Sequence, residues 1–123
     1  LDPNDFNSFG PGMFWSSSYF NESSRSRFAH TIMIPMDSRC VASPTGTRDY
    51  VFYYEGGLSW SVPYIAGLYA LACQAYPDTT PTLFWDIAGK TGKKTMIKED
   101  GDSIEFGIII NPVVLVEALE KLR

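Results

Sequence analysis

The stretch GGLSWSVPYIAGLYALACQAYP, residues 56–77, decides the fold of this chain. Two glycines and Ser59 precede a long apolar run. The pattern of this run predicts a helix over Trp60–Tyr76 that is apolar on nearly every side. A helix that is apolar on every face is normally buried. Pro63 falls in its first turn, where the missing N–H costs little. We therefore expect a buried helix with Ser59 at its amino end.

Two roles suit a serine at that position. Serine is a preferred N-cap residue, because its hydroxyl oxygen accepts hydrogen bonds from the first free N–H groups of a helix. The same free N–H groups and the helix dipole favour negative charge, so the position also suits a nucleophile whose backbone N–H stabilises an oxyanion. Position alone favours the cap for Ser59.

Patterns upstream of this helix predict two strands. The apolar run Thr31–Met36 predicts a buried strand that ends at Pro35, because proline cannot donate to a strand ladder. The β-branched and aromatic run Tyr50–Tyr54 predicts a second strand. Residues 43–49, between the two strands, have the composition of a turn.

Patterns downstream predict two helices and a hairpin. Thr80 and Pro81 predict the start of a helix that Gly89 and Gly92 end. The pair Asp100-Gly101 predicts a hairpin between strands at residues 96–98 and 104–106. The pair Asn111-Pro112 predicts the start of a last helix. The inner face of the first of these helices would be formed by Leu83, Phe84, Ile87 and Ala88.

In this context the residues around Ser59 resemble the nucleophile motif of the subtilisin-like serine proteases, the subtilases. Their motif is G-T-S-M-A-x-P followed by H-V-A-G, and five residues of this chain match it in register. The flanking strands and helices also resemble family elements in the same order, from about Thr31 to the last residue. The resemblance implies an α/β fold with a subtilisin-like three-layer arrangement, a mostly parallel sheet with flanking helices, of which this chain is an incomplete C-terminal portion. The matching residues are Gly57, Ser59, Pro63, Ala66 and Gly67.

The resemblance implies a role for each matched residue. Ser59 would be the catalytic nucleophile, and its backbone N–H one oxyanion donor. Structural roles would fall to Gly57, Pro63 and Gly67. The chain departs from the family pattern at three positions, where Leu58, Trp60 and Tyr64 replace Thr, Met and His. Leu58 and Trp60 would contact substrate, and all three departures favour an alternative, a non-catalytic subtilase-like module that acts as a pseudoprotease or a protein-interaction domain. A third alternative is an unrelated small α/β binding domain, in which Ser59 is an ordinary cap.

The catalytic partners of Ser59 are not recognisable in this chain. In subtilisin the order along the chain is Asp, His, Ser, and the first two lie far upstream. His30 is the one histidine, and neither it nor Asn4 and Asn7 has the sequence context of the family's base or oxyanion residue. We therefore expect the isolated chain to be inactive and the full-length parent to be a serine endopeptidase acting through an acyl-enzyme. Its partners would be a polypeptide substrate and the missing N-terminal part of the same protease.

Composition narrows the remaining classes. The length of 123 residues favours one domain, with residues 1–30 as an irregular, aromatic-rich arm and residues 31–123 as the subtilase-like part. The net charge of −4 argues against binding to nucleic acid, and the longest apolar runs are too short to span a membrane.

With no signal peptide recognisable, we expect a soluble protein and leave its compartment open. We expect no cofactor and no metal, with the acidic turn Glu99, Asp100 and Asp102 solvated, and free, mostly buried thiols at Cys40 and Cys73.

Overall fold

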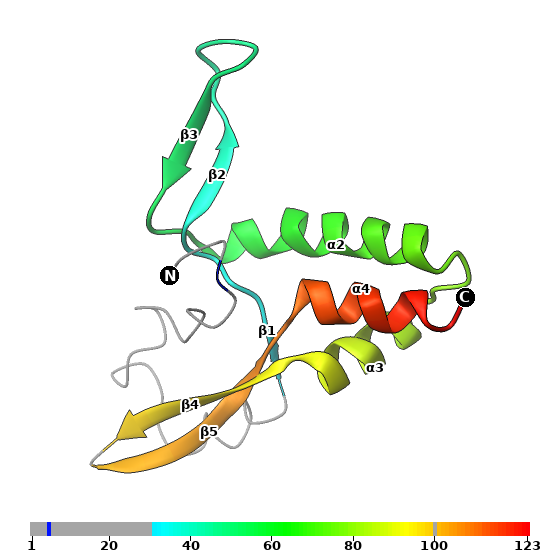
Figure 1. Cartoon of the computed structure of the whole chain (residues 1–123). Helices are drawn as coiled ribbons and strands as arrows, with labels where there is room; N and C mark the ends of the chain where they lie inside the picture. Colours follow the sequence, from blue (N-terminus) through cyan, green and yellow to red (C-terminus); the bar gives the residue numbers. More distant parts are fainter. Residues whose placement is uncertain (1–4, 6–30, 100) are drawn as a thin grey trace.

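The computed structural model describes residue 5, residues 31–99 and residues 101–123. In that part of the chain, three α-helices lie together at one end, and strands extend from them in two directions (Figure 1). The predicted arm falls outside the described residues except for Asp5, and so does His30. The helices are α2 (Ser61–Ala75), α3 (Pro81–Thr91) and α4 (Pro112–Glu120), with a short 3₁₀ helix, η4 (Leu58–Trp60), directly before α2. The strands are β1 (Ile32–Met33), β2 (Arg39–Ala42), β3 (Tyr50–Tyr53), β4 (Lys93–Glu99) and β5 (Asp102–Ile109).

The strands form two small sheets. The first has the order β1-β5-β4, in which β1 runs parallel to β5 and β4 antiparallel to it. The second is the antiparallel pair β2-β3, which projects away from the helices as a hairpin (Figure 1). The described chain is therefore mixed α/β, and one of its three strand pairings is parallel, so the expected mostly parallel sheet is not found there. The reason is the short connections at residues 43–49 and 100–101, because a parallel pair needs a crossover of a dozen residues or more.

The helix starts at α3 and α4 confirm the sequence prediction. Thr80 Oγ1 accepts a hydrogen bond from the Leu83 N–H at 3.2 Å, and Pro81 occupies the first helical position. Asn111 Oδ1 accepts from the Val114 N–H at 3.2 Å in the same way. These caps satisfy N–H groups that have no partner inside the helix. Of the two glycines predicted to end α3, Gly92 is its C-cap as expected, whereas Gly89 lies inside the helix, which continues to Thr91.

The core lies between the three helices and the end of β5. Ile110 joins it directly after β5, and β1 packs against it through the half-buried Ile32. Both strands thereby anchor the larger sheet to the helices. The buried cluster consists of Leu68, Ala72, Phe84, Ile87, Ala88, Ile110, Leu115 and Leu119.

The prediction that helix α2 is buried on every face is wrong for the described part of the chain. Leu68 and Ala72 on its inner side are buried against α4 and the core. On its outer side, Val62 is 71% exposed and Leu71 53% exposed. The helix is apolar all round, but the described elements cover one side of it. None of the helices in the described ranges is long and apolar enough to cross a bilayer.

Candidate functional site

Ser59 lies in the 3₁₀ turn η4 with its side chain exposed, directly before α2. The N-cap position of α2 belongs to Trp60, which has helical φ and ψ of −73° and −21° and makes no side-chain capping bond. Because η4 runs into α2 without an extended residue between them, Ser59 is not the N-cap of α2. The serine is therefore at the amino end of the helix, as expected, but the capping role that its position alone favours is not what the structure shows.

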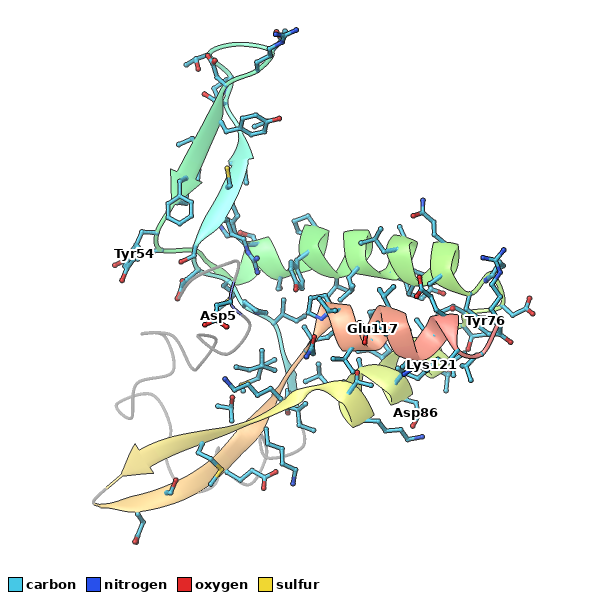
Figure 2. All side chains as sticks on the ribbon, in the orientation of Figure 1. Asp5, Tyr54, Tyr76, Asp86, Glu117 and Lys121 are labelled. Carbon is cyan, nitrogen blue, oxygen red and sulfur yellow. The ribbon has the colours of Figure 1, made fainter. Side chains whose placement is uncertain are left out.

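The turn that leads to Ser59 lies against the segment that follows β1. The Ser38 N–H donates a hydrogen bond to the Tyr54 carbonyl oxygen at 3.0 Å. The Gly56 N–H donates to Asp37 Oδ1, also at 3.0 Å. Figure 2 shows Tyr54 at the base of the β2-β3 hairpin, directed away from the helices. Residues 36–38 thus support residues 54–56, immediately upstream of the serine.

Gly56 marks the closest approach of these two segments. A Cβ atom built at Gly56 would lie 1.8 Å from the carbonyl oxygen of Met36, whereas one at Gly57 would meet its nearest neighbour, Trp60 Cδ1, at 3.8 Å. A side chain at Gly56 would therefore force two backbone segments apart, while a methyl group at Gly57 would make ordinary contact. The strict steric requirement for glycine in this turn is at Gly56.

Two of the residues that depart from the subtilase motif make aromatic contacts near the start of α2. The rings of Trp60 and Tyr53 are 5.1 Å apart between centroids and tilted by 58°. The Arg39 guanidinium lies 4.5 Å from the centroid of the Tyr64 ring, in cation–π geometry, and also donates to the Pro35 carbonyl oxygen. These contacts join the β2-β3 hairpin to the first turns of α2.

Burial changes the proton affinities of Arg39 and Tyr64. It lowers the pKa of Arg39 from its ordinary value, an effect that Tyr64 and Asp37 oppose. It raises the pKa of Tyr64 above the ordinary 10.0, and the positive charge of Arg39 opposes that rise. Desolvation disfavours the charged form of each group. The pair therefore consists of a cation and a neutral phenol ring at neutral pH.

The other matched positions lie on the exposed side of α2. Pro63 and Ala66 are exposed, and a Cβ at Gly67 would find no atom within 4 Å. The side chain of Leu58 lies outside the described residues. The structural roles of Gly57, Pro63 and Gly67 and the substrate contacts of Leu58 and Trp60 stay predictions.

Three residues that lack the sequence context of the family's base and oxyanion residue, His30, Asn4 and Asn7, all lie outside the described residues. In the ranges that the structure describes, no three His, Cys, Asp or Glu side chains lie close enough together to hold a metal ion. Asp100, in the predicted acidic turn, is also outside those ranges. Cys40 and Cys73 are free thiols, as predicted, but the predicted burial is wrong for Cys40, which is exposed on the two-stranded β2-β3 sheet, while Cys73 is half-buried.

Sequence reasoning missed three residues that shape the site: Asp37, Arg39 and Gly56. A glycine pair signals a turn, but only the folded chain shows which glycine approaches another backbone. Asp37 and Arg39 follow a predicted strand end, and no spacing rule links them to a serine some twenty residues away. Comparisons of the chain with family models, with curated proteins and with solved structures found no match, so the resemblance to subtilases stands on the residues of this sequence alone.

Proposed function

We propose that this chain carries the nucleophile of a serine endopeptidase, with Ser59 as the attacking residue. The observation that carries the proposal is the exposed serine side chain in the turn that opens α2, at the position where the sequence matches the subtilase motif. The amino end of a helix favours negative charge, which suits an oxyanion that forms beside the Ser59 N–H. The main competing explanation for the position of Ser59 is that it caps α2, but Ser59 is not the N-cap residue of that helix.

The reaction is peptide hydrolysis in two steps. The Ser59 oxygen bonds to the substrate carbonyl carbon, its proton passes to a base, and the amine leaves with that proton. Water then attacks the acyl-enzyme, which releases the carboxylic acid and restores the serine hydroxyl. A substrate in extended form would lie beside a sheet edge. The base and its orienting carboxylate would come from an N-terminal part of the same protease.

The outer face of α2 supports the proposal that a second part of the protease packs against this chain. All 15 residues of α2 are uncharged, and Val62 and Leu71 are exposed on the outer side. Exposed apolar surface of this kind suits contact with further polypeptide. In the proposal, that polypeptide is the missing part of the protease, and together the two parts would form the subtilisin-like three-layer fold.

The test is a fluorophosphonate probe, which reacts stoichiometrically with an activated serine. The full-length parent should be labelled at Ser59, and Ser59→Ala should abolish both labelling and peptide hydrolysis. Ser61→Ala, two residues along the chain, is the matched control and should be labelled normally. A parent that is never labelled at Ser59 would refute the proposal.

The isolated 123-residue chain gives a second test. We expect it to hydrolyse no peptide bonds and to resist rapid labelling, because a serine hydroxyl without a base is a weak nucleophile. Rapid stoichiometric labelling of Ser59 in the isolated chain would show that the base is already present in it. That result would overturn the assignment of the base to another part of the protease.

A second candidate function, a protein-interaction module, is favoured by the β2-β3 hairpin. One face of the hairpin carries the cross-strand pairs Cys40–Phe52 and Ala42–Tyr50, and all four side chains are exposed. Tyr50 is 73% and Phe52 53% exposed. A two-stranded sheet with an uncovered apolar face is marginal by itself, so contact with another protein would stabilise it. Under this alternative the parent binds protein but is not labelled at Ser59.

A further inference from the structure

The turn that presents Ser59 is held by a carboxylate that the subtilase resemblance does not assign. The Gly56 N–H donates to Asp37 Oδ1 at 3.0 Å, and the Ser38 N–H donates to the Tyr54 carbonyl oxygen at 3.0 Å. Each segment donates one hydrogen bond and accepts one. Residues 37–38 are therefore bonded to the residue before Glu55 and to the residue after it. Hydrogen bonds to an ionised acceptor are stronger than those between neutral groups.

Two further observations, the backbone conformation of Ser38 and the close approach at Gly56, mark this contact. Ser38 is buried and has φ of 58°, in the left-handed region that residues other than glycine seldom adopt. Gly56 approaches Met36 so closely that a Cβ atom would overlap the Met36 carbonyl oxygen. A non-glycine residue in the left-handed region and a glycine at a close backbone approach therefore meet at the same contact, which indicates that surrounding interactions over-determine the conformation of Ser38.

Contacts on the other side of the turn connect it to the helix. The Trp60 N–H donates to the Gly57 carbonyl oxygen at 2.9 Å and closes the 3₁₀ turn that contains Ser59. The ring of Trp60 lies against Tyr53. The turn is therefore fixed at its start by Asp37 and at its end by Trp60, with Ser59 in between.

We propose that Asp37 is a positioning residue for Ser59: its carboxylate holds the Gly56 amide and so sets the turn in which the serine is presented. Asp37 acts through Gly56 and has no contact with the reacting atoms in this account. The inference rests on the proposed function for the importance of Ser59, but the positioning contact itself can be measured without any peptidase activity.

The test is amide hydrogen exchange, followed residue by residue in the 123-residue chain. In Asp37→Ala, exchange at Gly56 and Trp60 should accelerate on the order of tenfold, because a hydrogen bond to a charged acceptor is lost. Amides in α3 and α4 should keep their rates. Asp37→Asn keeps an acceptor oxygen without its charge, so it should restore part of the protection at both residues.

Asp49→Ala is the matched control, because Asp49 also accepts a side-chain hydrogen bond, from Thr45 Oγ1 at 2.9 Å, but in the exposed hairpin loop. It should leave Gly56 and Trp60 unchanged. Unchanged exchange at Gly56 and Trp60 in Asp37→Ala would overturn the proposal. A uniform acceleration across the chain would also overturn it, because that pattern marks general loss of stability.

Gly56→Ala tests the same contact with the carboxylate still present. The added methyl group should separate the two segments and accelerate exchange at Trp60, whereas Gly57→Ala should not. Equal effects of the two alanines would count against the contact at Gly56. These rates do not depend on Ser59 being a nucleophile, so a parent that is not labelled at Ser59 would refute the proposed function and leave this measurement unaffected.

Discussion

Helices α2 and α3 each have a proline in their first turn, yet their outer faces differ. Helix α3 has a side-chain cap at Thr80. Its exposed side carries Asp86, labelled in Figure 2, in an ion pair with Lys90, with the nitrogen and oxygen 2.6 Å apart. Helix α2 has no side-chain cap and no charged residue. The exposed side of α3 carries a charged pair beside Trp85, whereas the exposed side of α2 carries no charge and is suited to further protein contact. The candidate nucleophile, Ser59, lies directly before α2, the uncharged helix.

The largest expected effect compares the two faces of α2 with one chemical change. Leu68→Ala should lower the free energy of unfolding by about 2–5 kcal/mol, because it leaves a cavity in the core. Leu71→Ala is the matched control and should change it by less than about 0.5 kcal/mol, because Leu71 faces solvent. Urea denaturation of the isolated chain measures both values. Equal losses would show that the outer face of α2 is already covered in the isolated chain.

The second effect compares the two helix starts. Thr80→Ala should lower the free energy of unfolding by about 1 kcal/mol, because the Leu83 N–H loses its acceptor. Ser59→Ala should cost less than about 0.5 kcal/mol, because Ser59 caps no N–H of α2. Thermal unfolding of the two variants measures the difference. A loss for Ser59→Ala as large as that for Thr80→Ala would restore the capping role of the serine.

The smallest effect concerns the first turns of α2 and is confined to alkaline pH. Burial raises the pKa of Tyr64 above its ordinary value, so the unfolded chain releases that proton before the folded chain does. The stability that the neutral phenol contributes is complete below about pH 10 and is lost as the pH rises through the raised folded pKa. The free energy of unfolding should therefore fall over this range, as measured by urea denaturation at stepped pH.

Tyr64→Phe is the control for this pH dependence, because it keeps a ring beneath Arg39 and removes the ionisable hydroxyl. The free energy of unfolding of this variant should fall less steeply than that of the unsubstituted 123-residue chain as the pH rises above about 10. The same slope in both proteins would show that Tyr64 is not the group responsible.

The starts of helices α3 and α4 show how much of the fold can be predicted from the sequence. Thr80-Pro81 and Asn111-Pro112 predict their helices correctly, because a cap and its N–H partner lie three residues apart and need nothing else from the fold. The predicted strand at Thr31–Met36 shortens to Ile32–Met33, because Pro35 cannot donate and, in the described part of the chain, β5 pairs with these two residues alone. Strand β2 was not predicted at all, since four residues that include Arg39 and Cys40 have a weak strand pattern until β3 pairs with them.

The helix that follows Ser59, the caps of the next two helices and the hairpin at residues 100–101 can be read from local sequence, because each depends on residues a few positions apart. Only the tertiary structure decided which face of α2 is covered, which of the two glycines must be glycine, and which carboxylate supports the serine turn. These last features depend on contacts between segments that are far apart in the sequence, such as Asp37 with Gly56. Local propensity carries no information about such contacts, because they arise only when the packing of the whole chain brings the two backbones together.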